Sequence, residues 1–140
     1  MTQIDSGRLF DDSQKAKKKG DVSSPDPWEQ VDAVAQVSPL AAVPLAWSAI
    51  EAELLSAVMR LNIYPPASSA IQNMHYLRLA NYLSPERFAV MKKMYQLRND
   101  SAHYKPPFPE ISIDEALAYT RVAQFIVTDL KGLTRRKSAN

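Results

Sequence analysis

Glycine is scarce in this chain. Its 140 residues include only three glycines, and none of them lies between Gly20 and Gly132. A glycine-rich phosphate loop, a dinucleotide-binding fingerprint and a nucleophile elbow all need glycine where the backbone turns sharply or approaches a ligand closely. The sequence therefore excludes P-loop nucleoside triphosphatases and Rossmann enzymes.

Cysteine is absent altogether, and histidine is nearly so. The lack of cysteine excludes disulfides, thiol catalysis and thiolate zinc sites. The two histidines are His75 and His103. A catalytic metal site usually takes two or three His or carboxylate ligands at defined spacings. We therefore expect no metal ion and no cofactor.

A long run of apolar residues is also missing. No uninterrupted stretch of about 18 apolar residues occurs, and residues 1–20 lack the apolar segment of a signal peptide. We expect a cytoplasmic protein without membrane contact.

The length of 140 residues and the mass of 15.7 kDa suit a single domain. Residues 1–27 are polar and charged, which predicts a flexible leader. The lysine run at 15–19 is interpreted as a solvated tail, with nucleic-acid contact as the alternative. We expect the folded domain at 28–132 and a basic tail at 133–140. The net charge is only +2, so any general affinity for polyanions would come from the tails and local clusters.

Apolar residues recur at helical spacing over most of the chain, and no segment alternates with the period of a strand. The pattern, together with capping signals, predicts helices over 28–37, 38–61, 68–82, 85–97 and 113–130. Pro44 would either kink the second helix or mark its start. We expect an all-α bundle of four or five helices. Its predicted core contains Leu40, Trp47, Ile50, Leu54, Val58, Leu77, Met91, Met94, Leu97, Leu117, Phe125 and Ile126.

Polar residues crowd one stretch, 97–104, with the sequence Leu-Arg-Asn-Asp-Ser-Ala-His-Tyr. Within a helix, Arg98 and His103 would be separated by about 140° of rotation and about 7.5 Å of rise. A guanidinium that binds phosphate and an imidazole that moves a proton near neutral pH suit phosphodiester chemistry. The alternative is structural: Arg98 and Asp100 bond to helix ends or to one another, and His103 bonds to a carbonyl at the end of the helix.

This stretch resembles the HEPN superfamily of small all-helical domains. Those domains carry an arginine, often followed by a polar residue, and then a histidine, as in Arg98-Asn99-x-x-x-His103. The segment 46–54 is similar to an earlier amphipathic helix of the family, and the resemblance covers roughly residues 38–131.

The resemblance implies a homodimer in which two motifs face one another and form a metal-independent endoribonuclease site. Arg98 would hold the scissile phosphate, Asn99 would position it, and His103 would deprotonate the ribose 2′-hydroxyl or protonate the leaving oxygen. Many family members are toxins or defence effectors. Others are non-catalytic modules for dimerisation or for binding nucleotide or RNA, and this is the alternative function.

Three more residues are candidates for supporting roles. Asp100 lies within the motif, Tyr104 follows it directly, and Glu51 could reach Arg98 from a facing helix. Family toxins paired with a nucleotidyltransferase antitoxin commonly carry a tyrosine two residues after the histidine, whereas here that place is taken by Lys105. The resemblance therefore leaves the branch open, with an antitoxin or nucleotidyltransferase as a possible partner.

Overall fold

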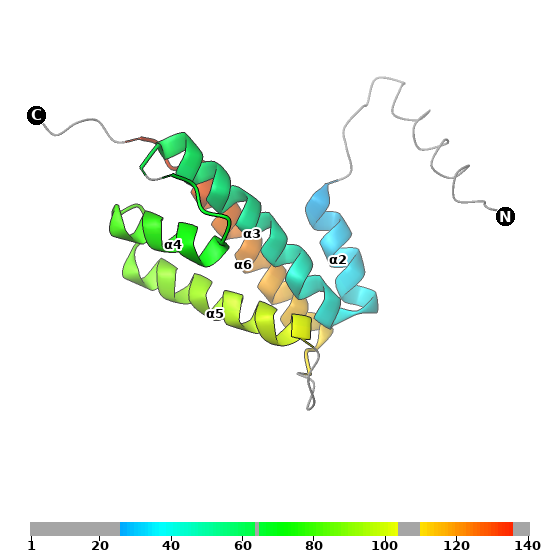
Figure 1. Cartoon of the computed structure of the whole chain (residues 1–140). Helices are drawn as coiled ribbons and strands as arrows, with labels where there is room; N and C mark the ends of the chain where they lie inside the picture. The colour runs from blue at the N-terminus through cyan, green and yellow to red at the C-terminus, as the bar shows by residue number, and fades with distance from the viewer. Residues whose placement is uncertain (1–25, 64, 104–109, 136–140) are drawn as a thin grey trace, which may run out of the picture.

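The computed structural model describes residues 26–63, 65–103 and 110–135, in which the chain forms five α-helices and no strand. The prediction of an all-α bundle is thereby confirmed. The expected leader up to residue 25 and the tail from residue 136 lie outside the described residues. The helices, shown in Figure 1, are α2 (Pro27–Val37), α3 (Pro39–Leu61), α4 (Ala70–Leu79), α5 (Pro85–His103) and α6 (Ile113–Lys131).

Two helix starts show how short sequence signals fix the ends of elements. At α2, the Asp26 side chain accepts a hydrogen bond from the Trp28 backbone N–H at 3.0 Å. Asp26 and Pro27 thus belong to the helical body, although the sequence assigned them to the leader. At α6, the predicted capping box is confirmed. Ser112 Oγ accepts from the Glu115 N–H at 3.0 Å, and Glu115 Oε1 accepts from the Ser112 N–H at 2.9 Å.

Helix α4 is shorter than the predicted range 68–82. It begins after Ser69 and ends before Ala80, and Asn81 then adopts a left-handed backbone conformation with φ 65°. The Tyr82 N–H donates to the Leu77 carbonyl at 2.8 Å. This hydrogen bond and the left-handed residue are typical of a Schellman closure, in which asparagine can take the place of glycine. The helix ends there even though apolar residues continue beyond it.

Helix α3 is the centre of the bundle, and the other four helices pack against it (Figure 1). Pro44 lies inside α3, so its alternative role as the start of the helix is wrong. By length and composition alone α3 is apolar enough to cross a membrane. Nine of its residues are buried against the other helices, which accounts for this apolarity. The absence of membrane contact and the cytoplasmic location stay predictions.

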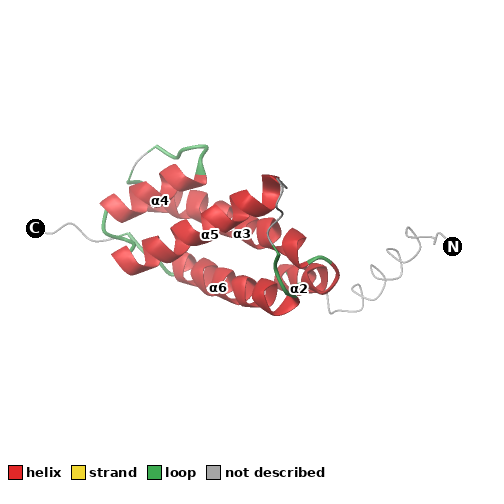
Figure 2. Cartoon of the chain, turned by 90° about the horizontal axis from the view of Figure 1, so that it is seen from below, coloured by secondary structure: helices red, strands yellow, loops and turns green. Residues whose placement is uncertain are grey.

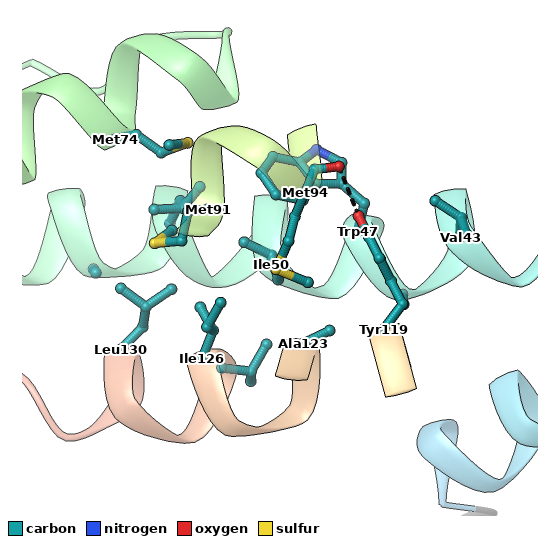
Figure 3. Packing of buried hydrophobic residues seen from close by; sticks show 14 of the residues in the cluster. Val43, Trp47, Ile50, Met74, Met91, Met94, Tyr119, Ala123, Ile126 and Leu130 are labelled. Atoms are coloured by element: carbon teal, nitrogen blue, oxygen red, sulfur yellow. Dashed lines mark hydrogen bonds between the residues drawn. The ribbon is translucent and has the colours of Figure 1, made fainter. Parts of the chain in front are cut away.

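The core forms where α3 meets α5 and α6 (Figure 3). Eight predicted core residues are buried: Trp47, Ile50, Leu54, Val58, Leu77, Met91, Met94 and Ile126. Leu40, Leu97 and Leu117 are half-buried. The prediction is wrong for Phe125, whose side chain is 59% exposed. Consecutive helical residues point about 100° apart, and Ile126 faces the core, so Phe125 points away from it. The Arg87 guanidinium lies over the Phe125 ring, 5.0 Å from the ring centroid.

Candidate functional site

The motif lies in the last turns of α5. The helix continues past Leu97 and ends at His103, so Arg98, Asn99 and the His103 backbone belong to one helical segment. The helical rise and rotation expected between Arg98 and His103 therefore apply. The side chain of His103 and the whole of Tyr104 lie outside what the structure describes.

Arg98 and Asn99 are held together by their side chains. Arg98 Nη1 donates to Asn99 Oδ1 at 3.0 Å, and both residues are half-buried. Within the described part of the chain, no carboxylate lies in ion-pair contact with Arg98. In particular, the exposed Asp100 does not neutralise it. Among the described residues, the guanidinium therefore keeps N–H donors and a positive charge that no carboxylate neutralises, and an anion such as phosphate can bind to them.

Ser101 anchors this turn, and sequence reasoning did not single it out. Its side chain is fully buried, and its hydroxyl donates to the Arg98 carbonyl at 2.9 Å. A fully buried side chain in the same helical turn limits how far the segment can move, so the position of Arg98 is tied to the packing of the bundle. In the sequence, this role is indicated only by the position of Ser101, a small residue with a hydroxyl group three positions after Arg98.

Tyr119 from α6 is a second residue near the motif, and the sequence does not indicate that it lies close to Arg98. Its side chain is 8% exposed, and its hydroxyl donates to the Met94 carbonyl at 2.9 Å. Burial raises the pKa of the Tyr119 phenol well above its ordinary value, and the positive charge of Arg98 opposes part of this rise. Arg98 and Tyr119 are thus electrostatic neighbours, although they are distant in the sequence.

Glu51 does not join this group. It lines a separate hollow of about 330 Å³, shared with Asn73 of α4. Helices α3 and α5 run antiparallel (Figure 1), and they meet where the Trp47 and Tyr95 ring centroids lie 5.6 Å apart. One helical turn from Trp47 to Glu51 therefore leads away from Arg98. Whether Glu51 can contact Arg98 depends on the relative directions of α3 and α5, which the sequence pattern does not predict.

The described residues contain no group of three or more His, Cys, Asp or Glu side chains that could hold a metal ion.

In comparisons with family models, curated proteins and solved structures, no match to this chain is found. The resemblance to HEPN domains thus rests on the sequence alone: the motif, its position before the last helix, and the earlier segment 46–54.

Proposed function

We propose that this protein is a metal-independent endoribonuclease in which Arg98 binds the scissile phosphate and His103 transfers a proton. The observation that carries the proposal is the state of Arg98. The residue is half-buried, and its guanidinium is hydrogen-bonded to Asn99 and has no carboxylate partner among the described residues. An arginine positioned in this way is suited to phosphate binding, and a histidine follows it at the end of the same helix.

In the proposed reaction, cleavage of RNA uses the side chains of Arg98 and His103. An imidazole takes the proton of a ribose 2′-hydroxyl, and the 2′-oxygen attacks the adjacent phosphorus. The bond from phosphorus to the 5′-oxygen breaks, and that oxygen takes up a proton from an acid. The products carry a 2′,3′-cyclic phosphate and a 5′-hydroxyl. Arg98 neutralises the charge that develops on the phosphate oxygens.

The resemblance implies that two copies of the chain complete this site. In such a homodimer, His103 of one copy acts as the base and His103 of the second copy as the acid. Asn99 keeps the guanidinium oriented through its hydrogen bond to Arg98. A toxin or defence role, with an antitoxin partner, belongs to the same proposal.

The first test incubates the purified full-length protein with labelled single-stranded RNA and a metal chelator. Cleavage with cyclic-phosphate ends is expected to persist. The variant His103→Ala should lower the rate by about 10²–10⁴-fold, the usual contribution of a proton-transfer group. His75→Ala is the matched control, because His75 is exposed on α4, with its ring 5.1 Å from Phe88, and should leave the rate unchanged.

The second test compares two arginines. Arg98→Ala should weaken both RNA binding and cleavage, whereas Arg121→Ala removes an exposed arginine that is paired with Asp32 and should change neither. Cleavage that disappears with the chelator would contradict the proposal. Intact RNA, with binding that depends on Arg98 but not on His103, would instead identify the non-catalytic RNA- or nucleotide-binding module.

A further inference from the structure

One side of α3 is left uncovered by the rest of the bundle. Helices α2 and α4 both pack on α3, and they lie on opposite sides of it in Figure 1 and Figure 2. Exposed residues recur at intervals of three and four along α3 and therefore share one side of the helix: Leu45, Ser48, Ala52, Leu55 and Met59. We call these five residues the α3 face.

The α3 face carries three large apolar side chains. Leu45 is 47% exposed, Leu55 is 39% exposed and Met59 is 59% exposed. The hollow of about 330 Å³ that contains Glu51 borders the middle of the face. A second hollow, of about 440 Å³, lies at the end of the face and is lined by Met59, Asn62, Ile63, Pro65 and Pro66. Exposed apolar side chains beside two hollows mark a surface on which another segment can bind.

The charges on α2 and α3 indicate what kind of segment fits this surface. Residues 26–61 contain five acidic side chains and one basic side chain: Asp26, Glu29, Asp32, Glu51, Glu53 and Arg60. Asp32 pairs with Arg121, and Glu53 pairs with Arg60. Among the described residues, Glu29 and Glu51 have no ion-pair partner, and Glu51 is half-buried. The surface around the α3 face is therefore short of positive charge, and a basic segment complements it.

We infer that the α3 face binds residues 9–19 of the same chain. This segment lies outside the described residues, and its sequence matches both features of the surface. The lysine run at 15–19 carries four positive charges that complement Glu29 and Glu51. Leu9 and Phe10 provide two large apolar side chains for the end of the face at Met59. The lysine run is then held against the protein instead of forming the solvated tail expected from its composition.

The chain is long enough to make this contact. A single residue joins α2 to α3, and the 11 residues of α2 run back beside α3 (Figure 1). A helix of that length returns Asp26 by about 16 Å, toward the middle of α3, where Glu51 lies. Lys19 precedes Asp26 by seven residues, which span at most about 25 Å. The order also agrees, because the apolar pair lies beyond the lysine run in the chain, as Met59 lies beyond Glu51 on α3.

Two other occupants fit this surface less well. Nucleic acid carries negative phosphates, which Glu29 and Glu51 repel. A second copy placed on the same face about a two-fold axis would set these acidic side chains against one another. The inference goes beyond the proposed function, because neither Arg98 nor His103 belongs to α2 or α3.

The first experiment traps the contact with a disulfide. The chain contains no cysteine, so only an introduced pair can react. In the full-length variant Ser13→Cys/Ala52→Cys, mild oxidation should form a disulfide within one chain. Ser13→Cys/Ala33→Cys is the matched control, because Ala33 is also exposed and lies only seven residues from Asp26 along α2, outside the α3 face. The contact raises the effective concentration of the thiols at 13 and 52, so this pair should react faster than the control by on the order of tenfold or more.

The second experiment measures how fast trypsin cleaves the lysine run of the full-length protein. Cleavage follows the fraction of molecules in which the segment is unbound. Glu51→Gln removes a charge and Met59→Gln removes an apolar side chain, and each should raise the cleavage rate by about two- to fivefold, the effect of losing one weak surface contact. Glu86→Gln on α5 and Val122→Gln on α6 are the matched controls, because both residues are exposed outside the α3 face. Both controls should be cleaved at the rate of the wild type.

Three results would each overturn the inference. Equal trapping at Ala52 and Ala33 would leave the α3 face to a basic segment of another protein. A disulfide between two chains, which denaturing gels distinguish from one within a chain, would assign the face to the segment of a second copy. Cleavage that Glu51→Gln and Met59→Gln leave unchanged would show that the lysine run is not bound there. None of these measurements uses RNA, so this inference and the proposed function can fail separately.

Discussion

Tyr119 of α6 donates a hydrogen bond from its hydroxyl to the backbone carbonyl of Met94 in α5, at 2.9 Å (Figure 3). Both helices pack mainly on α3, so this bond is one of the direct links between them. Further along, Arg87 of α5 pairs with Asp129 of α6. Two polar links thus join helices that otherwise depend on α3 for their positions.

Tyr119→Phe removes the hydroxyl and keeps the ring in the core. We expect the free energy of unfolding to fall by about 1 kcal/mol, the usual net contribution of a buried hydrogen bond. Chemical denaturation measures this difference. Tyr95→Phe is the control, because it keeps the ring that contacts Trp47, and its hydroxyl makes no hydrogen bond to a described residue. If both variants lose the same free energy of unfolding, the hydrogen bond from Tyr119 to Met94 does not contribute to stability.

The same phenol predicts how stability depends on pH. Burial raises the pKa of Tyr119 in the folded state, whereas the unfolded chain releases this proton near pH 10. The unfolded state therefore binds fewer protons at high pH, and the free energy of unfolding falls as the pH rises above about 10. Below that pH the contribution is complete.

Denaturation of the wild type and of Tyr119→Phe, repeated between about pH 9 and pH 11, isolates this effect from other ionising groups. Above about pH 10 the difference in unfolding free energy should shift against the wild type by up to about 1.4 kcal/mol per pH unit. A difference that stays constant over this range would mean that the phenol ionises equally in both states.

Two neighbouring positions on α6 should respond very differently to truncation. Ile126 is 1% exposed in the core, and Ile126→Ala should destabilise the protein by about 2–5 kcal/mol through lost burial and a cavity. Phe125 is 59% exposed, and Phe125→Ala should cost far less. Thermal unfolding of both variants tests this order. A large loss for Phe125→Ala would restore the sequence-based assignment of Phe125 to the core.

Ser101 links the stability of the bundle to the position of Arg98. Ser101→Ala loses one hydrogen bond to the Arg98 carbonyl but keeps the packing, so we expect a cost of at most about 1 kcal/mol and retained RNA cleavage. Ser101→Leu overfills the site, which costs about 1–3 kcal/mol and shifts the turn. Its cleavage rate should fall while the bundle remains helical. Unfolding and cleavage assays on the same samples separate the two effects, and full activity in Ser101→Leu would contradict this role.

The sequence by itself determined which segments become helices, because the signals are local. The capping box joins Ser112 to Glu115 within one turn, and the repeat of apolar residues over α3 follows helical geometry without reference to any partner. The sequence also singles out the stretch from Arg98 to His103, whose backbone lies at the end of one helix, and its role as a site stays a prediction. The left-handed closure at Asn81 was missed, since asparagine permits that conformation without requiring it.

Only the tertiary structure decided which helix faces meet. Ile126 is buried and Phe125 is not, because α3 covers one side of α6, and a broad apolar stripe does not specify the side. The directions of three helices in the bundle bring Arg98 close to Tyr119. The same directions keep Glu51 away from Arg98. Those directions bury apolar side chains of all five helices in one core, a condition that no single segment of sequence contains.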